Sequence, residues 1–346
     1  MTGKIKKNLT TELEETLMRE IMLGIHTPGG TFPSELESVK RFQVSRVTVR
    51  RAYAKLEEKG ILIRNRRCNT VVNDRLFATA EPISMVGALL PLQQTFSNRF
   101  LACLNDEAAA EKALIVLAPP FASGRELELA AMDMVLHGVR NLVVWCGDHE
   151  VDMQIFRRLR LLGINLVFFD LVNPGEVADF VSLDNRHAVK SLLEKALQDG
   201  FRKFAFLNTA DLRADSNLER ENVFENFCRE RKLEFSIHTL PWKKMLAEGA
   251  AEECRTVYQA VPEPDKTAFF CVNQFVARSV CNAVGGQGNY YMISIPEDEV
   301  LPRSRCVIQP ISEMAKECFQ SLRRQQNAGR RWKAAEVRLK GCPDWL

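Results

Sequence analysis

The residues best suited to chemistry in this sequence are basic, and they stand close together. Arg46, Thr48, Arg50 and Arg51 fall within six residues of one another. A guanidinium group donates paired hydrogen bonds to a guanine edge or to phosphate oxygens, and a threonine hydroxyl can bind phosphate. These groups read a base sequence only when one rigid helix presents them together to the major groove. The surrounding elements therefore decide whether this chemistry is available.

Residues 33–60 predict two helices joined by a tight turn. Ser34 and Glu37 have the spacing of a capping box, which would start the first helix. Residues 42–44 form the turn, Ser45 is a good N-cap for the second helix, and Gly60 suits the position after its end. The segment thus predicts a helix-turn-helix unit whose second helix begins with the basic residues.

The second helix has one apolar stripe and one basic face. The stripe recurs at the i, i+3, i+4 and i+7 positions of a buried helix face, namely Val49, Ala52, Tyr53 and Leu56. Residues 40–67 contain ten basic and two acidic residues, a net charge of +8, whereas the whole chain carries only +3. A basic helix face is often merely solvated. The concentration of charge on one small module favours phosphate binding instead.

Two further elements flank this unit. A capping box at Thr11 and Glu14 predicts a helix that ends at Gly24. Residues 61–63 and 70–72 predict two short strands with a basic turn between them. This hairpin is either a structural cap or a contact to the DNA backbone, and the arginines clustered at its tip favour the contact.

Residues 9–73 resemble the winged helix-turn-helix domain of the GntR family of bacterial transcription regulators. The matching pieces are PGGTFPSE (28–35), VSRVTVRRAYAKLEEKGIL (44–62) and the end of the wing at 70–72. The resemblance implies base contacts from arginines at the start of the second helix, and phosphate contacts from neighbouring hydroxyl groups and from the wing. The DNA-binding residues expected in this way are Ser34, Ser45, Arg46, Thr48, Arg50, Arg51, Arg66 and Arg67.

The head departs from the family pattern at two places. The family usually has arginine at the position of Leu36, so we expect one DNA contact to be missing. The wing tip usually carries two glycines, where this chain has Arg67 and Asn69. Because arginine adopts the left-handed conformation poorly, we expect a reshaped wing in which Arg67 reaches a phosphate or the minor groove.

Length and composition indicate a two-domain protein of the cytoplasm. The 346 residues suffice for two domains with sizeable cores. The charged N-terminus lacks the apolar stretch of a secretory signal, and no apolar run is long enough to span a bilayer. The ten cysteines include no C-x-x-C pair, so we expect reduced thiols. Periodicity stops near Asn73, and a linker is expected at 74–82.

From residue 83 onward, predicted strands and helices alternate. This order is typical of an α/β domain with a parallel sheet covered by helices on both faces. Such sheets bind ligands at the carboxyl ends of their strands, where this chain has several polar residues, although polar residues also simply begin loops. The predicted helices include 185–198 and 218–231. The predicted strands are 83–90, 113–118, 141–146, 165–170, 203–208, 268–273 and 290–295.

The second resemblance covers residues 83–325, which are similar to the effector domain of the LacI/GalR family and to periplasmic sugar-binding proteins. It is carried by VSLDN (181–185), GFRKFAFL (200–207), Ser216 with Arg220 before Phe224, Asn273 after its strand, and VIQP (307–310). It implies two α/β lobes joined by three crossover strands, lobe one at about 83–182 and 310–325 and lobe two at about 183–309, within a body of residues 83–346. A sugar-like ligand would lie between the lobes, held by Asp170, Ser216, Arg220, Trp242, Asn273 and Gln309.

Two departures from the LacI/GalR pattern fall near the expected ligand. Family members usually have Asn-Asp where this chain has Asn273-Gln274, and an aspartate where it has Pro296. The carboxylate that commonly holds a sugar hydroxyl is therefore missing. We expect either a ligand other than a common hexose or a body that binds none.

The sequence offers little for catalysis. Residues 146–149 lack the spacing of a zinc site, and the glycine-rich residues 285–288 precede a strand, whereas a phosphate loop follows one. Neither a nucleophile elbow nor a nucleophile–base pair is recognisable. We therefore expect no metal, no cofactor and no enzymatic activity.

The order of domains, a GntR-like head on a LacI-like body, resembles the arabinose-repressor type of regulator. The leading hypothesis is a repressor that binds a palindromic operator as a homodimer, with a small effector that weakens or strengthens DNA binding. One alternative is a constitutive DNA-binding protein whose body only dimerises. Another is a fusion to an aminotransferase-like body that uses pyridoxal phosphate, for which this body is short.

Overall fold

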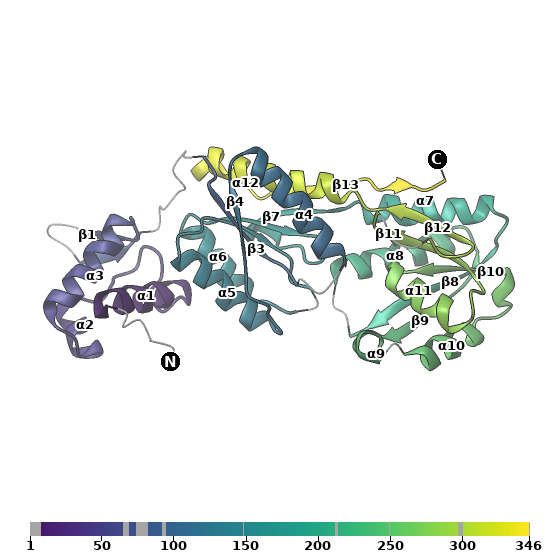
Figure 1. Cartoon of the computed structure of the whole chain (residues 1–346), viewed down its shortest axis with the longest axis horizontal. Helices are drawn as coiled ribbons and strands as arrows, with labels where there is room; N and C mark the ends of the chain where they lie inside the picture. The colour runs from purple at the N-terminus through teal and green to yellow at the C-terminus, as the bar shows by residue number, and fades with distance from the viewer. Residues whose placement is uncertain are drawn as a thin grey trace.

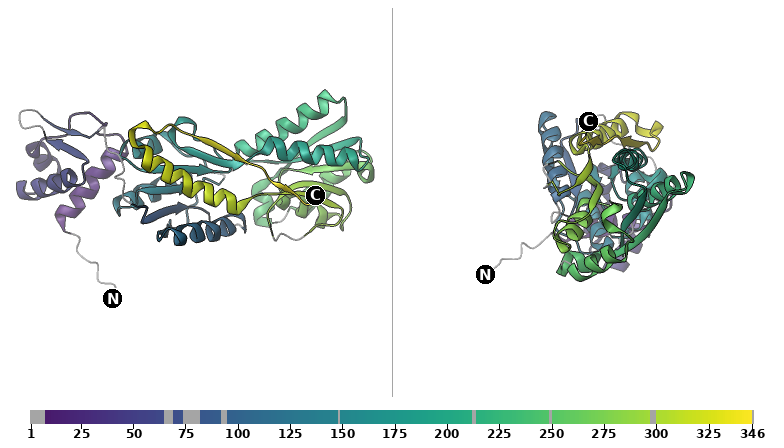
Figure 2. Two further views of the ribbon diagram at one scale, coloured as in Figure 1. Left: turned by 90° about the horizontal axis from the view of Figure 1, so that it is seen from above. Right: turned by 90° about the vertical axis from the view of Figure 1, so that its right-hand side faces the viewer.

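The computed structural model describes residues 8–64, 69–73, 82–91, 95–147, 149–211, 214–248, 250–296 and 300–345. The molecule is elongated, with a small head at one end and two α/β lobes in a row behind it (Figure 1). The C-terminal segment runs along lobe one and ends on lobe two (Figure 2). The predicted fold class, a winged helix-turn-helix head on a two-lobed α/β body with parallel sheets, is confirmed.

The head contains the predicted helices and wing strands. The capping box of Ser34 and Glu37 is present, and Gly60 has the left-handed φ of +71° that favours glycine after a helix. Antiparallel pairing joins the two wing strands. The elements are α1 (Leu9–Met22), α2 (Glu35–Phe42), α3 (Arg46–Glu58), β1 (Leu62–Arg64) and β2 (Thr70–Val72).

The start of the first helix differs from its prediction. Asn8 is the N-cap of α1, and its side chain accepts a hydrogen bond from the Thr10 N–H. The capping box predicted at Thr11 and Glu14 is therefore wrong, because both residues lie inside the helix. Glu14 instead forms ion pairs with Lys55 and Lys59 of α3, which hold α1 against the helix-turn-helix unit.

Lobe one is built on a six-stranded sheet of order β13-β7-β6-β5-β3-β4, in which every pair of neighbours is parallel. Its strands are short and rich in β-branched and aromatic residues, and helices cover both faces, so the central strands are fully buried. The chain passes through β3 (Met85–Leu89), α4 (Thr95–Ala110), β4 (Leu114–Leu117), α5 (Gly124–Leu136), β5 (Asn141–Val144), α6 (Met153–Leu161), β6 (Asn165–Phe169) and β7 (Asp179–Leu183).

Lobe two contains a second six-stranded sheet of order β14-β12-β11-β10-β8-β9. It is parallel except for β14, the last strand along the chain. The sequence missed β9, β12 and β14. Strand β9 is only half-buried at the sheet edge, which weakens its apolar pattern. The elements are α7 (Asn185–Gln198), β8 (Lys203–Ala210), α8 (Asp215–Glu230), β9 (Glu234–Pro241), α9 (Trp242–Glu248), α10 (Ala251–Ala260), β10 (Thr267–Cys271), α11 (Gln274–Ala283), β11 (Asn289–Ser294), β12 (Ser304–Ile308) and β14 (Cys342–Pro343).

The chain crosses between the lobes after β7, after β12 and again after β13 (Glu336–Leu339). The third crossing passes Gly341 at close range. A Cβ atom there would lie 2.5 Å from Val307 Cγ1 and 2.8 Å from the Ile308 carbonyl oxygen, so only glycine fits. These crossings place the carboxyl ends of both sheets opposite each other, which is where a ligand between the lobes would lie.

The head packs on lobe one through α1, which contacts α5 and α6. The apolar cores of the head and of this side of lobe one form one continuous cluster. Arg158 of α6 donates a 2.6 Å hydrogen bond from Nε to the Met22 carbonyl oxygen, at the negative end of α1. Arg19 of α1 also forms an ion pair with Asp133 of α5. The position of the head on the body is therefore specified by side chains as well as by the linker.

Two observations bear on the setting of the chain. Among the described helices, none combines the length and the apolar composition that a bilayer span requires. None of the cysteines in the described ranges forms a disulfide, and seven of them are buried.

The C-terminal helix α12 (Ile311–Ala328) is fastened to lobe one by Gln325. Its Oε1 accepts a 2.9 Å hydrogen bond from the Leu166 N–H, and its Nε2 donates to the Leu166 carbonyl oxygen at 2.7 Å and to Asp179 Oδ2 at 2.9 Å. Leu166 lies in β6 just before the β7 pairing begins at Val167. The Gln325 amide therefore takes the place of a missing strand neighbour.

We predict that Gln325→Leu destabilises lobe one. The substitution leaves the two backbone groups of Leu166 and one oxygen of Asp179 without these partners in a buried place. Each buried unsatisfied group costs about 1–3 kcal/mol, so the three groups together predict a loss of roughly 3–9 kcal/mol, visible as a lower urea midpoint. Gln320→Leu, on the exposed face of the same helix, should change stability by about 0.5 kcal/mol or less. Equal midpoints for both variants would contradict the role of Gln325.

Candidate functional site

Helix α3 presents basic side chains to solvent at the far end of the molecule. Ser45 is its N-cap, and the Thr48 N–H donates to Ser45 Oγ over 3.1 Å. Arg46, Arg50 and Arg51 are exposed, away from the buried stripe of the helix. The cap fixes where the helix starts and the stripe fixes its rotation, so three guanidinium groups are held on the solvent side.

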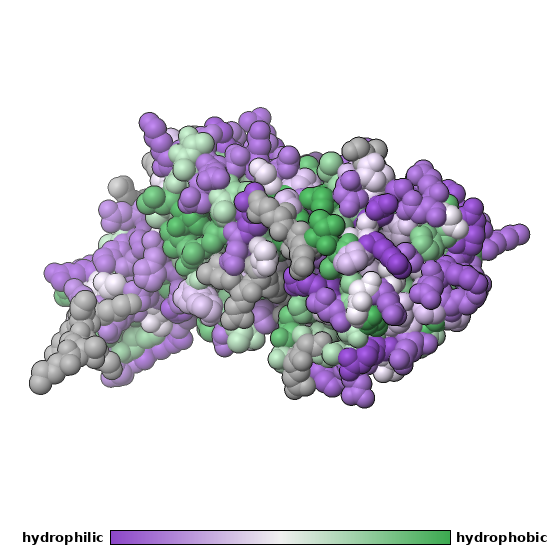
Figure 3. All heavy atoms as spheres, turned by 45° about the vertical axis from the view of Figure 1, so that its right-hand side comes forward, coloured by the Kyte–Doolittle hydropathy of each residue, from purple (hydrophilic) through white to green (hydrophobic). Residues whose placement is uncertain are grey.

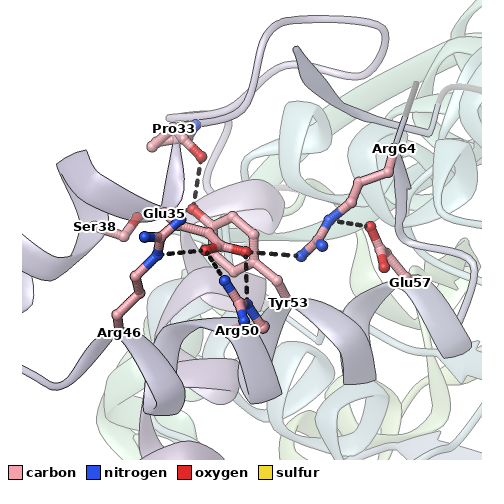
Figure 4. A network of polar contacts seen from close by, with 8 residues as sticks. All are labelled: Pro33, Glu35, Ser38, Arg46, Arg50, Tyr53, Glu57 and Arg64. Atoms are coloured by element: carbon pink, nitrogen blue, oxygen red, sulfur yellow. Dashed lines mark hydrogen bonds and ion pairs between the residues drawn. The ribbon is translucent and has the colours of Figure 1, made fainter. Parts of the chain in front are cut away.

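The carboxylate of Glu35 pairs with arginines of α3 and of the wing (Figure 4). Glu35 Oε2 lies 3.1 Å from Arg46 Nε and 3.5 Å from Arg50 Nη2, and Glu35 Oε1 lies 3.4 Å from Arg64 Nη2. Arg64, on β1, also pairs with Glu57 of α3 at 2.7 Å. The first residue of α2 thus joins the recognition helix to the wing. Each guanidinium has five N–H donors, so this pairing leaves donors for a ligand.

The Glu35 carboxylate is held in its charged form. Burial opposes its ionisation, since its side chain is only 18% exposed. Hydrogen bonds from Arg46 and Arg50 outweigh burial and keep the pKa of Glu35 below its ordinary value. Sequence reasoning missed this residue. Its signal was an acidic side chain one position after an N-cap, facing a basic helix across a tight turn.

The other expected DNA-binding residues divide into three groups. Ser34 is engaged by the capping box, in which the Glu37 N–H donates to Ser34 Oγ over 3.3 Å. Thr48 Oγ1 lies 2.8 Å from Ser45 Oγ, so both hydroxyls stand together at the start of α3. Arg66 and Arg67 lie outside the described residues. Contacts of these two residues with DNA, and DNA contacts of the other residues expected on this face, stay predictions. Leu36, which stands where the family has arginine, is 59% exposed.

A cavity of about 340 Å³ lies between the lobes, and all six residues expected to hold a ligand line it. They arrive from the ends of separate elements: Asp170 follows β6, Ser216 and Arg220 belong to the first turns of α8, and Trp242 begins α9. Asn273 caps α11, and Gln309 follows β12. These six residues were expected from the resemblance to the LacI/GalR family, and the structure brings them to one cavity, although their roles in binding stay a prediction.

Two buried polar atoms at this cavity, Ser216 Oγ and Gln309 Oε1, have no hydrogen-bond partner within the described part of the chain. Asp170 and Trp145 are buried beside them, and a hydrogen bond from the Trp145 indole acts to lower the pKa of Asp170. A buried polar atom without a partner costs free energy, so two of them at one cavity favour a polar ligand that bonds them. Sequence reasoning missed Trp145, although an indole at the end of a buried strand is a recognisable signal.

Asp170 and Arg220 are a pair of opposite charges buried at the junction of the lobes. Burial raises the pKa of Asp170 and lowers that of Arg220, and the charge of each partner opposes these shifts. Arg220 donates from Nε to Asn185 Oδ1 at 2.7 Å and from Nη1 to the Val272 carbonyl oxygen at 2.6 Å. Asp170 has a φ of +67°, a strained conformation for a residue other than glycine. The burial of these two charges and the backbone conformation of Asp170 therefore both cost free energy of folding.

Aromatic side chains line both sides of the cavity. Trp242 packs edge-on against Phe275 in lobe two, with ring centres 5.4 Å apart, and Phe96 packs against Trp145 in lobe one at 5.3 Å. Flat apolar rings surrounded by a few polar atoms are typical of sites for small polyhydroxylated ligands.

A larger cavity of about 520 Å³ lies on the other side of Asp170 and Ser216, which line both spaces. Its remaining lining comes from α7, α8 and β13, and includes the ion pair of Glu219 with Arg338. It lacks the tryptophans and the unpartnered Gln309 oxygen. We therefore place the candidate ligand site in the smaller cavity.

Comparison with known proteins identifies the head. Residues 9–72 match the profile of the bacterial regulatory proteins of the gntR family. The head is a gntR-family DNA-binding domain. The gntR profile covers α1 to β2, the same elements that carry the arginine face and its Glu35 anchor.

Longer comparisons cover the body. The chain is 22% identical over 299 residues to the arabinose metabolism transcriptional repressor of Geobacillus stearothermophilus, covering 83% of this chain and 79% of that protein. The trehalose repressor of Escherichia coli shares the fold, with a TM-score of 0.61, 13% identity, and coverage of 75% of this chain and 99% of that one. A LacI family transcriptional regulator from Enterococcus faecium with bound ribose gives a TM-score of 0.61, 14% identity, and coverage of 75% and 97%. The chain thus has a gntR-family head and a body with the fold of LacI-family regulators.

We predict that the stabilising effect of Glu35 depends on pH. Because its pKa is lowered in the folded protein, the ionised form adds stability above the ordinary pKa of about 4.5, and this stability is lost as the pH falls through the folded value. Glu35→Gln should therefore unfold at a lower temperature than the parent protein at pH 7, and the two should converge once the pH falls below the lowered pKa of Glu35.

The measurement is thermal unfolding of the full chain by circular dichroism at several pH values. Glu58→Gln, which removes an exposed carboxylate of the same head, is the control and should match the parent protein throughout. A difference between Glu35→Gln and the parent that stays constant with pH would refute the ionic anchor.

Proposed function

We propose that the chain is a transcription repressor that binds operator DNA through its gntR head as a homodimer, with a small polyhydroxylated effector bound between the lobes of its body. The observation that carries the proposal is the set of unpartnered polar atoms around the inter-lobe cavity, in a chain whose head exposes an anchored arginine face. A regulator needs one surface for DNA and a separate site for a signal, and these are the two features concerned.

On the head, the support is geometric. Arg46 and Arg50 stand one turn apart at the exposed start of α3, and a carboxylate restrains both of them. A restrained guanidinium loses less conformational entropy when it forms the paired hydrogen bonds that recognise guanine. We therefore assign base contacts to these two residues, and phosphate contacts to Ser45, Thr48 and Arg51.

Dimerisation is supported by an exposed apolar edge. Strand β4 ends the lobe-one sheet, and its Leu114 and Leu117 are 68% and 42% exposed. Apolar residues gather on the face of lobe one shown in Figure 3. An open strand edge with leucines on it is a site for association. Pairing of two copies through it would supply the two recognition helices that a palindromic operator needs.

In the cleft, the support is chemical. Asp170 Oδ1 and Gln309 Oε1 are acceptors, Trp145 Nε1 is a donor, and Ser216 Oγ can act as either. Hydroxyl groups both donate and accept, so a polyhydroxylated ligand can bond the unpartnered Ser216 Oγ and Gln309 Oε1 and also meet Asp170 and Trp145. The repressor of arabinose metabolism and the ribose-bound regulator are similar to this chain, which agrees with a sugar or a sugar derivative.

A second candidate function is a DNA-binding protein whose body only dimerises. It is favoured by Gln274, which stands where related effector domains have aspartate and whose Oε1 accepts a hydrogen bond from Ser294 Oγ. A thermal-shift screen separates the two, because an effector at 100 times its dissociation constant adds about 2.7 kcal/mol of stability, and a body without a ligand gains nothing.

The buried thiols agree with a reducing, cytoplasmic setting.

We predict that Arg46→Ala and Arg50→Ala each weaken operator binding by roughly 10- to 100-fold, because each removes a base contact worth about 1–3 kcal/mol. Both side chains are exposed, so each variant should still fold, with only the small loss of stability that follows from removing one ion pair to Glu35. The operator would come from in vitro selection with the parent protein, and affinities from a gel-shift titration at fixed salt. Arg255→Ala, an exposed residue of α10 in lobe two, should bind as the parent does. Unchanged discrimination between operator and scrambled DNA in Arg46→Ala would sink the assignment.

We predict that Ser216→Ala separates ligand binding from stability. Ser216 Oγ is buried without a partner, so its removal should leave the ligand-free protein as stable as the parent, or more stable by up to about 1–2 kcal/mol. The shift produced by an effector should shrink, because one hydrogen bond to it is lost. Arg220 is less suited to this test, since its loss would also leave Asp170 buried and uncompensated.

The matched control is Ser321→Ala. Ser321 Oγ is buried as well, but it accepts a hydrogen bond from Arg324. This variant should lose stability and keep the full effector shift. The reverse pattern, in which Ser216→Ala destabilises the protein and leaves the effector shift intact, would show that the Ser216 hydroxyl is structural.

A further inference from the structure

The charges that line the candidate ligand cavity do not balance. Its described lining contains three charged residues: the carboxylate Asp170 and the guanidinium groups of Arg220 and Arg278. Asp170 and Arg220 face each other and compensate one another. Arg278 is left as one positive charge in excess.

Arg278 belongs to the second turn of α11 and lines the cavity from lobe two. Its guanidinium lies 5.9 Å from the ring centre of Phe275, which offers it a weak cation–π contact. It forms no ion pair with any carboxylate in the described ranges, whereas Arg338 of the neighbouring cavity pairs with Glu219. Arg220 has no such close pair in these ranges, but its charge interacts with those of Asp170 and Glu219. A half-buried guanidinium at the wall of a ligand site, with donors to spare, suits an oxyanion.

The acidic group that would balance Arg278 is absent from the neighbouring position. Gln274, one helical turn before Arg278, is neutral and is 7% exposed. Its Oε1 accepts a hydrogen bond from Ser294 Oγ, which ties the start of α11 to the end of β11. A carboxylate at this place would have paired with a nearby guanidinium and neutralised it. Its replacement by an amide leaves the positive charge available to a ligand.

The backbone also contributes positive electrostatic potential at the cavity. Helices α8 and α11 both begin at the cavity, with Ser216 in the first turn of α8 and Asn273 as the N-cap of α11. Helix N-termini carry partial positive charge, and Ala214 at the α8 N-cap supplies no side-chain oxygen. The unpartnered Ser216 hydroxyl is the second observation that directs this helix start towards a ligand.

We propose that the effector is a polyhydroxylated anion, a sugar carrying a phosphate or carboxylate group that Arg278 binds while the hydroxyl groups meet Asp170, Ser216 and Gln309. This inference rests on the proposed function, since it names the chemical class of the effector of that same cleft. Phosphate and carboxylate present the same paired oxygens to a guanidinium.

The test uses the full chain and two variants, one expected to weaken binding and one expected to leave it unchanged. Arg278→Gln removes the charge in the cleft, and Arg255→Gln removes an exposed charge elsewhere in lobe two, on α10. The probes are matched sets: ribose with ribose 5-phosphate, glucose with glucose 6-phosphate and glucuronate, and galactose with galacturonate. Binding is measured by thermal shift and then by isothermal titration calorimetry at two salt concentrations.

We expect at least one acidic sugar to bind more tightly than its neutral parent, and Arg278→Gln to weaken that binding by roughly 10- to 100-fold. Arg255→Gln should bind as the parent protein does. Higher salt should weaken binding to the parent protein more than binding to Arg278→Gln. A phosphate or a uronate as the tighter ligand would identify which anion the cleft selects.

Two results would overturn the inference, and they differ in what else they overturn. If a neutral sugar binds at least as tightly as its acidic partners, or if Arg278→Gln binds an acidic sugar normally, the anion is wrong and the sugar-responsive repressor stands. If no member of any set binds, while the head still binds its selected operator, the anionic effector and the polyhydroxylated effector both fall.

Discussion

The body depends on one buried pair of charges at the junction of its lobes. Arg220 is 5% exposed and Asp170 is 7% exposed, and an isolated charge at such a depth would be strongly unfavourable. Each is retained because the other is there. Arg220 also bonds Asn185 at the start of α7 and the Val272 carbonyl oxygen after β10, so one side chain fixes α8 against two neighbouring elements of lobe two. The shape of the ligand cavity follows from where this pair lies.

The head has a similar group of opposite charges at its surface, in which positive charges outnumber negative ones. Glu35 holds Arg46, Arg50 and Arg64, so one carboxylate restrains three guanidinium groups and leaves a net positive charge. In the described lining of the cavity, one carboxylate interacts with Arg220, and Arg278 has no ion pair. In the described parts of both places, arginines therefore outnumber the acids beside them. Positioning by a fixed carboxylate lowers the entropy that the arginine loses on binding.

The sequence predicted those features that depend on local chemistry. The Ser34–Glu37 capping box and the stripe at Val49, Ala52 and Leu56 follow from spacing. The six cavity-lining residues were expected from the resemblance to the LacI/GalR family. It missed features set by tertiary contacts. Asn8 starts α1 ahead of a good capping box at Thr11. Strand β9 alternates only briefly, at Phe235 and Ile237, and β14 is two residues long. The roles of Glu35 and Trp145 arise only when separate elements meet.

The way the head is mounted limits how a ligand could control it. Helix α1 packs on α5 and α6 of lobe one, and Arg158 bonds the end of α1 directly. A ligand in the cleft touches both lobes and favours one angle between them. A change in that angle moves lobe two relative to a head and lobe one that stay together. Within one chain, such a movement leaves the recognition helix where it was relative to lobe one. The signal reaches DNA only if the second copy contacts lobe two in addition to the β4 edge of lobe one, because the two heads then change their spacing. Ligand control in this architecture therefore requires the dimer.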